Sequence, residues 1–119
     1  MLFLGKKAYA PARRMIDAGV RVALATDFNP GSSPTYSMAL TLTLACSQMG
    51  MDPLEAIVAA TAGGAAALKL EDGRGTIRAG APADLIVWDV PDYNEIPYRF
   101  GTPPIRRVYK AGNMVFSCL

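Results

Sequence analysis

A short apolar run at Val20–Ala25 most constrains how this chain can fold. The run is interrupted only by Arg21, and it leads directly into a polar, turn-rich stretch at 26–34. Short apolar runs with β-branched residues, placed directly after a glycine, are typical of strands that are buried on both faces of a parallel sheet. The pattern therefore predicts a buried parallel strand and an α/β fold for this part of the chain.

Helices are expected on both sides of this strand. Residues 8–18 predict a helix that ends at Gly19, a residue suited to a left-handed C-terminal cap. The stretch 34–49 is ambiguous, because part of it alternates like a strand while its other apolar residues fall at helical spacing. We favour a helix, with Ser33 as its N-terminal cap and Gly50 at its end.

A further helix is predicted from Asp52 onward. Asp52 is suited to the cap position, a proline follows at the first turn, and Glu55 completes a capping box. Gly63 and Gly64 are expected to interrupt this helix, at a cost of roughly 1–2 kcal/mol of helix stability. Another helical piece is expected at 65–70.

From residue 71 onward the predicted elements become short strands. They are a brief strand at 76–77, a strong strand at 85–88, an irregular segment or short helix at 93–100, and a hairpin of 105–109 and 114–116. The sequence thus joins an α/β part and a β-rich part within 119 residues, which is barely long enough for one domain.

Composition excludes several classes of function. The chain contains no histidine, so it cannot form a Ser-His-Asp or Cys-His catalytic group or a histidine-based zinc site by itself. Its net charge is +2 and its basic residues cluster only in pairs, which argues against nucleic-acid binding. Cys46 and Cys118 do not form the pattern of a secreted disulfide framework, and no signal peptide or membrane span is evident. We therefore expect a cytoplasmic protein without a membrane partner.

Asp27 is the clearest candidate for chemistry, because it follows the predicted strand. Ligands and catalytic groups of parallel α/β proteins sit at the carboxyl ends of the strands. Asp27 could bind a metal, act as a general base, or do both; the alternative is an Asp that braces the loop. Asn29 is either a turn residue or a ligand. The N–H groups of Gly31, Ser32 and Ser33, expected just before a helix, could hold an anion or cap that helix.

The segment Asp27-Phe28-Asn29-Pro30-Gly31-Ser32, with 19–26 before it, closely resembles the imidazolonepropionases of the amidohydrolase superfamily. The resemblance covers essentially the whole chain and includes 83–89, a motif common to many amidohydrolases. It implies the C-terminal slice of a metal-dependent (β/α)8 barrel over 1–70. Strands of a small β-sandwich domain are implied over 71–119.

The resemblance also implies roles for four residues. Asp27 would ligate the metal, zinc or iron, and accept a proton from the attacking water. Asn29 would bind the substrate, and Gly31 and Ser32 would hold its carboxylate. The intact enzyme would hydrolyse the cyclic amide C–N bond of 4-imidazolone-5-propanoate to N-formimino-L-glutamate, a step of histidine degradation.

The sequence departs from this family in its metal ligands. The family supplies several histidines, including an early His-x-His pair, and a catalytic metal needs about three protein ligands. With Asp27 alone, the chain is expected to be inactive by itself. Two alternatives stay open: a portion of another amidohydrolase, cytosine-deaminase-like or dihydroorotase-like, and a non-catalytic association module. A homodimer is compatible with these interpretations.

Overall fold

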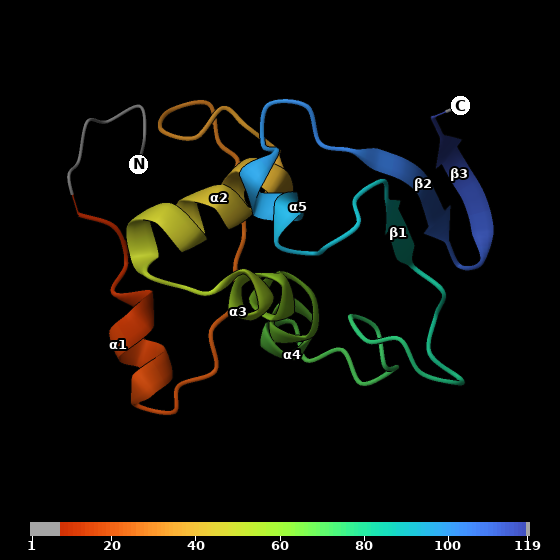
Figure 1. Ribbon diagram of the computed structural model, residues 1–119. Helices are drawn as coiled ribbons and strands as arrows, with labels where there is room; N and C mark the ends of the chain where they lie inside the picture. The colour runs from red at the N-terminus through yellow and green to blue at the C-terminus, as the bar shows by residue number, and fades with distance from the viewer. Residues whose placement is uncertain (1–7, 119) are drawn as a thin grey trace.

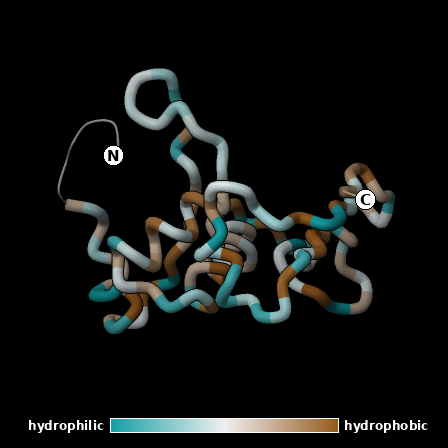
Figure 2. Tube along the Cα trace, turned by 45° about the horizontal axis from the view of Figure 1, so that its top comes forward, coloured by the Kyte–Doolittle hydropathy of each residue, from teal (hydrophilic) through white to brown (hydrophobic). Residues whose placement is uncertain are grey.

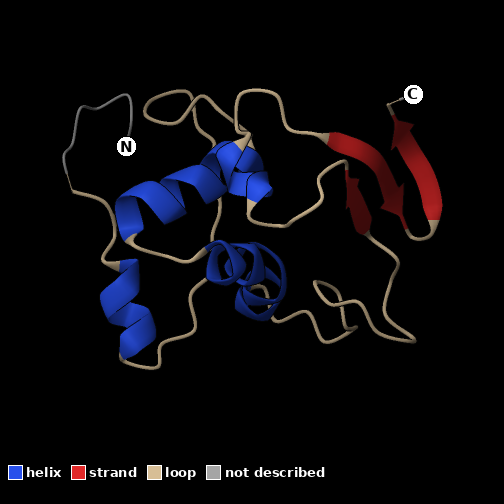
Figure 3. Cartoon of the chain, in the orientation of Figure 1, coloured by secondary structure: helices blue, strands red, loops and turns tan. Residues whose placement is uncertain are grey.

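The computed structural model describes residues 8–118, in which helices and strands occupy opposite sides of the molecule (Figures 1 and 3). The helices are α1 (Ala12–Asp17), α2 (Met38–Met49), α3 (Pro53–Val58), the π-helix η2 (Ala59–Gly63), α4 (Gly64–Ala67) and α5 (Glu95–Tyr98). The strands are β1 (Leu85–Trp88), β2 (Ile105–Lys110) and β3 (Asn113–Ser117). In the described part of the chain, no helix has the length and apolar character needed to cross a membrane.

The predicted C-terminal stop of α1 is confirmed. Gly19 has a φ of +76°, and its N–H donates to the carbonyl of Ile16 at 2.8 Å. The N–H of Val20 donates to the carbonyl of Met15 at 2.9 Å, which completes a Schellman motif. The chain therefore leaves α1 in a fixed direction and enters the apolar run.

The predicted helix at 34–49 is present as α2, but it begins later than expected. Ser37 is the cap, and its hydroxyl accepts a hydrogen bond from the N–H of Leu40 at 3.2 Å. The assignment of Ser33 as cap is wrong, because Ser33 is buried and its hydroxyl donates to the carbonyl of Thr26 at 2.7 Å. The helix ends at Gly50 as predicted, with a φ of +67°.

The segments α3, η2 and α4 form one continuous helical run, which contradicts the predicted interruption at the two glycines. Gly63 and Gly64 both have right-handed helical backbone angles. A Cβ placed on Gly63 would lie 2.4 Å from the carbonyl oxygen of Val22. Gly63 is therefore the residue that lets the helix and the apolar run approach closely. The start of α3 is as predicted. Pro53 lies in its first turn, and the Glu55 carboxylate accepts a hydrogen bond from the Asp52 N–H at 2.9 Å.

The apolar run is not a sheet strand in the described part of the chain. We refer to residues 20–26 as the extended segment; it passes alongside the helices and forms no β-ladder (Figure 1). Val22 and Leu24 pack against the helical core, whereas Ala23 and Ala25 are exposed. The prediction of a strand buried on both faces is therefore wrong here, because only one face is covered.

The sheet is antiparallel with the order β1-β2-β3, and it contains the predicted hairpin as β2 and β3. Ala111 and Gly112 both have positive φ, which is the conformation of a tight two-residue hairpin turn. Asp84 holds this turn by accepting from the N–H of Ala111 at 2.9 Å and by pairing with Lys110, which lowers the pKa of Asp84. The brief strand predicted at 76–77 is wrong, since these residues pair with no strand and Ile77 is 92% exposed.

The core is thin and is built mainly from small residues. Its buried members are Ala12, Leu42, Ala45, Met51, Ala56, Ala59 and Ile96. Many large apolar side chains lie outside it, on β1 and β3 and along the loops, and hydrophobic stretches run over much of the trace in Figure 2. The high apolar content of the sequence is thus only partly used for burial within the described residues.

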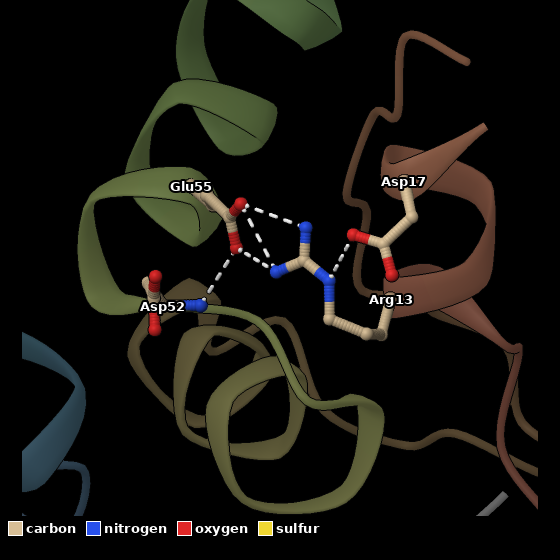
Figure 4. A network of polar contacts seen from close by, with 4 residues as sticks. All are labelled: Arg13, Asp17, Asp52 and Glu55. Atoms are coloured by element: carbon tan, nitrogen blue, oxygen red, sulfur yellow. Dashed lines mark hydrogen bonds and ion pairs between the residues drawn. The ribbon is translucent and has the colours of Figure 1, made fainter. Parts of the chain in front are cut away.

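An ion-pair network joins α1 to α3 (Figure 4). The Arg13 guanidinium donates to both carboxylate oxygens of Glu55 at 2.8–3.1 Å and to Asp17 at 2.8 Å. The hydrogen bonds from Arg13 hold the pKa of Glu55 below its usual value, and the bonds to Glu55 raise the pKa of Arg13. Since Glu55 also accepts from the Asp52 N–H, one carboxylate fixes both the start of α3 and its contact with α1.

Candidate functional site

Asp27 lies directly after the extended segment, as the sequence predicted. Its φ is +52°, a left-handed conformation that L-residues other than Asn and Asp seldom adopt. Asp27 is exposed, and its left-handed backbone ends the extended conformation of the preceding residues. Non-glycine residues in this conformation are concentrated at functional sites, because the surrounding structure must hold them there.

The Asn29 side chain organises the loop that follows. Its Oδ1 accepts from the N–H of Gly31 at 2.9 Å, from the N–H of Ser32 at 2.8 Å and from the Ser32 hydroxyl at 3.2 Å. Its Nδ2 donates to the carbonyl of Asp27 at 2.6 Å. Asn29 therefore connects the three other predicted site residues through its own amide.

The N–H groups of Gly31, Ser32 and Ser33 were expected just before a helix. This expectation is wrong, because no helix begins directly after them. A bridge between Asn29 and Ser33 closes the loop, with the Asn29 N–H donating to the Ser33 carbonyl at 3.0 Å. The helix α2 begins only at Met38, so residues 34–37 separate it from the loop. Gly31 and Ser32 donate their N–H groups to the Asn29 side chain.

A pocket of about 310 Å³ lies beside this loop and against α2. Asp27 and Ser32 both line it, together with Tyr9 and Thr41. The lining does not include Asn29 or Gly31. The sequence had not placed Thr41 beside this pocket, because the alternation around it was considered only as a secondary-structure signal.

An aromatic pair flanks the same loop. The rings of Phe28 and Tyr36 meet edge to face with their centroids 6.0 Å apart. They remain 63% and 84% exposed, respectively. The contact joins the residue after Asp27 to the segment before α2, and no pattern in the sequence had indicated it.

The donor set of this chain does not fit a catalytic metal ion. Asp27 contributes one carboxylate, and within residues 8–118 no three His, Cys, Asp or Glu side chains lie close enough together to hold a metal. The sequence contains no histidine. Since a catalytic zinc needs about three protein ligands, these residues cannot form such a centre by themselves.

Comparison with known proteins gives consistent matches. The profile described as the Amidohydrolase family matches residues 4–115. The imidazolonepropionase of Bacillus velezensis is 48% identical over 115 residues, and that of Geobacillus kaustophilus is 50% identical over 115 residues. Each match covers 97% of this chain but only 27% of the relative, so the chain spans about a quarter of the length of these curated proteins.

Solved structures match in the same partial way. An amidohydrolase from Thermotoga maritima aligns with a TM-score of 0.70 at 27% identity, covering 89% of this chain and 25% of that chain. An adenosine deaminase from Xanthomonas campestris, solved with bound zinc, aligns with a TM-score of 0.78 at 25% identity, covering 92% of this chain and 28% of that chain. The mixed α/β structure described above thus corresponds to a portion of these larger folds.

Proposed function

This chain belongs to the amidohydrolase family, and from that premise we propose that it is part of an imidazolonepropionase. The observation that carries the proposal is the identity of 48–50% to imidazolonepropionases over nearly the whole chain. The deaminase with a similar structure is only 25% identical to this chain in sequence. The identity therefore favours an imidazolonepropionase over the deaminase alternative.

In this proposal residues 1–70 are the last βα units of the catalytic (β/α)8 barrel, and 71–119 are strands of a small β-sandwich domain. The extended segment is then a barrel strand, and Asp27 stands at its carboxyl end. Catalytic residues of such barrels come from this end of several different strands. The placement of Asp27 after the extended segment supports this assignment.

The substrate class follows from the relatives: the intact enzyme would hydrolyse the cyclic amide C–N bond of 4-imidazolone-5-propanoate to N-formimino-L-glutamate. Asp27 is the residue of this chain that would accept a proton from the attacking water, since its carboxylate is exposed and lines the pocket beside the Asn29 loop. Ser32 shares the pocket with Asp27 and is within reach of the same small molecule.

The Asn29 loop supports a carboxylate-binding role. Two N–H groups and one hydroxyl, from Gly31 and Ser32, converge on the single oxygen Asn29 Oδ1. A substrate carboxylate oxygen is an acceptor of the same kind and would take that place when the Asn29 amide turns toward the ligand. The family is metal-dependent in general, but residues 8–118 do not by themselves provide the donors of a metal centre.

A chimera tests the proposal. The segment of the Geobacillus kaustophilus imidazolonepropionase that matches this chain is replaced by this sequence, and loss of the imidazolone substrate is followed. We expect the chimera to turn over the substrate and the Asp27→Asn variant to lose activity by about 10²-fold or more, as general base removal does. Asp89→Asn, at an exposed carboxylate with one 3.8 Å contact to Arg106, is the matched control and should retain activity. A folded chimera without hydrolysis would refute the proposal.

A further inference from the structure

The peptide groups on both sides of Asp27 are held by side chains of the loop that follows. The carbonyl of Thr26, in the peptide group before Asp27, accepts from the Ser33 hydroxyl at 2.7 Å. The carbonyl of Asp27 itself, in the peptide group after it, accepts from Asn29 Nδ2 at 2.6 Å. Because peptide groups are planar, the orientations of these two groups determine the φ and ψ of Asp27. Two separate hydrogen bonds therefore hold its left-handed φ of +52°.

Of the two side chains, Ser33 is the more firmly placed. It is the one buried polar residue within the part of the chain that the structure describes, with 9% of its surface exposed. Its carbonyl accepts from the Asn29 N–H at 3.0 Å, and Pro34 after it restricts its backbone to extended conformations. The hydroxyl therefore starts from a fixed backbone position.

The bond from Asn29 is less suited to holding Asp27 during a reaction. It lies at an exposed position, whereas the bond from Ser33 is partly shielded from water, and shielding strengthens a hydrogen bond. The Asn29 amide would also move when it turns toward a substrate carboxylate. The Ser33 hydroxyl does not contact that amide, so its bond to Thr26 can persist with a ligand bound.

We propose that Ser33 is a positioning residue for the hydrolysis, which acts by keeping Asp27 left-handed and so aiming its carboxylate into the pocket that both residues line. The direction of the Cα–Cβ bond follows from the backbone around it, so rotation of the peptide group before Asp27 moves the carboxylate. A displacement of about 1 Å at a reacting group can cost about 10²-fold in rate. The inference rests on the proposed function for the role of Asp27 as the base, whereas the hold on its backbone rests on the hydrogen bonds alone.

The hold on the backbone is tested in the chain by itself. Ser33→Ala removes the donor, and we expect the backbone NMR chemical shifts of Asp27 to move away from those of a left-handed residue. Ser33→Cys is a second variant that keeps a side chain of similar shape and donates only weakly, so it should fold and shift Asp27 in the same direction. Ser37→Ala is the matched control. It removes the hydroxyl that accepts from the Leu40 N–H at the start of α2, and it should leave the Asp27 shifts unchanged.

The effect on hydrolysis is tested in the chimera with the Geobacillus kaustophilus enzyme. Ser33→Ala should lower kcat by about 10- to 100-fold. Ser37→Ala loses a helix cap but no contact with the peptide groups around Asp27, so it should keep kcat within about twofold. A double-mutant cycle with Asp27→Asn separates positioning from a general loss of structure. In that background Ser33→Ala should change kcat by less than about twofold, because no base is left to be misplaced.

The outcomes separate the positioning role from the proposed function. Unchanged Asp27 shifts in the Ser33 variants, equal losses of kcat in Ser33→Ala and Ser37→Ala, or the same loss with and without the Asp27 carboxylate would each overturn the positioning role. Unfolding of both Ser33 variants would assign the hydroxyl to stability and overturn it as well. A folded but inactive chimera, together with Asp27 shifts that still respond to Ser33, would support the hold on the backbone and count against the proposed function.

Discussion

Adding one methyl group at Gly63 tests the contact between the α3–η2–α4 run and the extended segment. The new Cβ would lie 2.4 Å from the Val22 carbonyl oxygen and 3.3 Å from that of Val58. Carbon–oxygen contacts between neighbouring elements are usually about 3.3–3.6 Å long. The helix and the segment would therefore have to separate by about 1 Å. Because both contacting groups are backbone, no side chain can rotate away to relieve the clash.

The size of the destabilisation is obtained by comparison with the same substitution at the neighbouring Gly64. Gly64 has helical backbone angles, and a Cβ there would meet only the Ala59 carbonyl oxygen at 3.9 Å. Gly64→Ala should therefore raise the free energy of unfolding by up to about 1 kcal/mol through helix propensity. Gly63→Ala has the same propensity gain but adds overpacking of about 1–3 kcal/mol. The difference in unfolding free energy between the two variants is the energy of the clash, about 1–3 kcal/mol.

Urea unfolding followed by far-UV circular dichroism measures this difference. The midpoint should fall from Gly64→Ala to Gly63→Ala without a change in slope, since both variants expose the same surface on unfolding. Hydrogen exchange at the Leu24 amide should quicken in Gly63→Ala, because its acceptor Ala59 lies on the displaced run. Equal stability of the two variants would show that the segment does not pack against Gly63, and the placement of the extended segment would then be wrong.

Three further predictions concern single contacts. Because its folded-state pKa lies below the usual 4.5, Glu55 contributes stability that is present above that value and lost as the pH falls through the folded pKa. Thermal melts of Glu55→Gln at neutral and acidic pH should therefore vary less with pH than those of the unaltered chain. Ser33→Ala removes the bond to the Thr26 carbonyl and should lower the unfolding free energy by about 1 kcal/mol in urea titrations. Ala111→Asn supplies the residue that a left-handed turn position favours and should raise the melting temperature, with a gain of up to about 1 kcal/mol.

Each of these has an outcome that contradicts it. An unchanged pH dependence in Glu55→Gln would mean that the Arg13 network does not persist in solution. Ser47→Ala, at an exposed hydroxyl on α2, is the control for Ser33→Ala, and equal effects of the two would deny the buried bond. A lower melting temperature for Ala111→Asn would exclude the left-handed turn.

Local signals in the sequence predicted the structure best. The stop at Gly19, the start at Asp52 and the hairpin turn each depend on interactions within a few residues, so their chemistry is readable without the rest of the fold. The prediction of Ser33 as a helix cap was wrong because its hydroxyl donates to the carbonyl of Thr26, seven residues away, and not to the nearest helix. The prediction that Gly63 interrupts the helix was wrong for a similar reason. A glycine is needed there because of the nearby Val22 carbonyl, and not because the helix ends.

The extended segment shows a different limit of sequence reasoning. Its apolar pattern predicts a strand buried on both faces, but pairing requires neighbours, and the described residues supply none. The position of Asp27 after this segment agrees with the sequence, and the Asn29 loop agrees with both the turn-residue and the ligand interpretation of Asn29. The roles of Asp27, Asn29, Gly31 and Ser32 stay predictions, because they depend on groups beyond this chain.

The bonds from Leu24 and Thr26 to the body of the molecule have a consequence for local opening. The Leu24 N–H donates to the Ala59 carbonyl, and the Thr26 carbonyl accepts from the Ser33 hydroxyl, so the extended segment is tied both to the helical run and to the Asn29 loop. Segments that are joined in this way tend to open together as one cooperative unit. The amides of Leu24 and Asn29, which donate to the carbonyls of Ala59 and Ser33, should therefore exchange their hydrogens at similar rates.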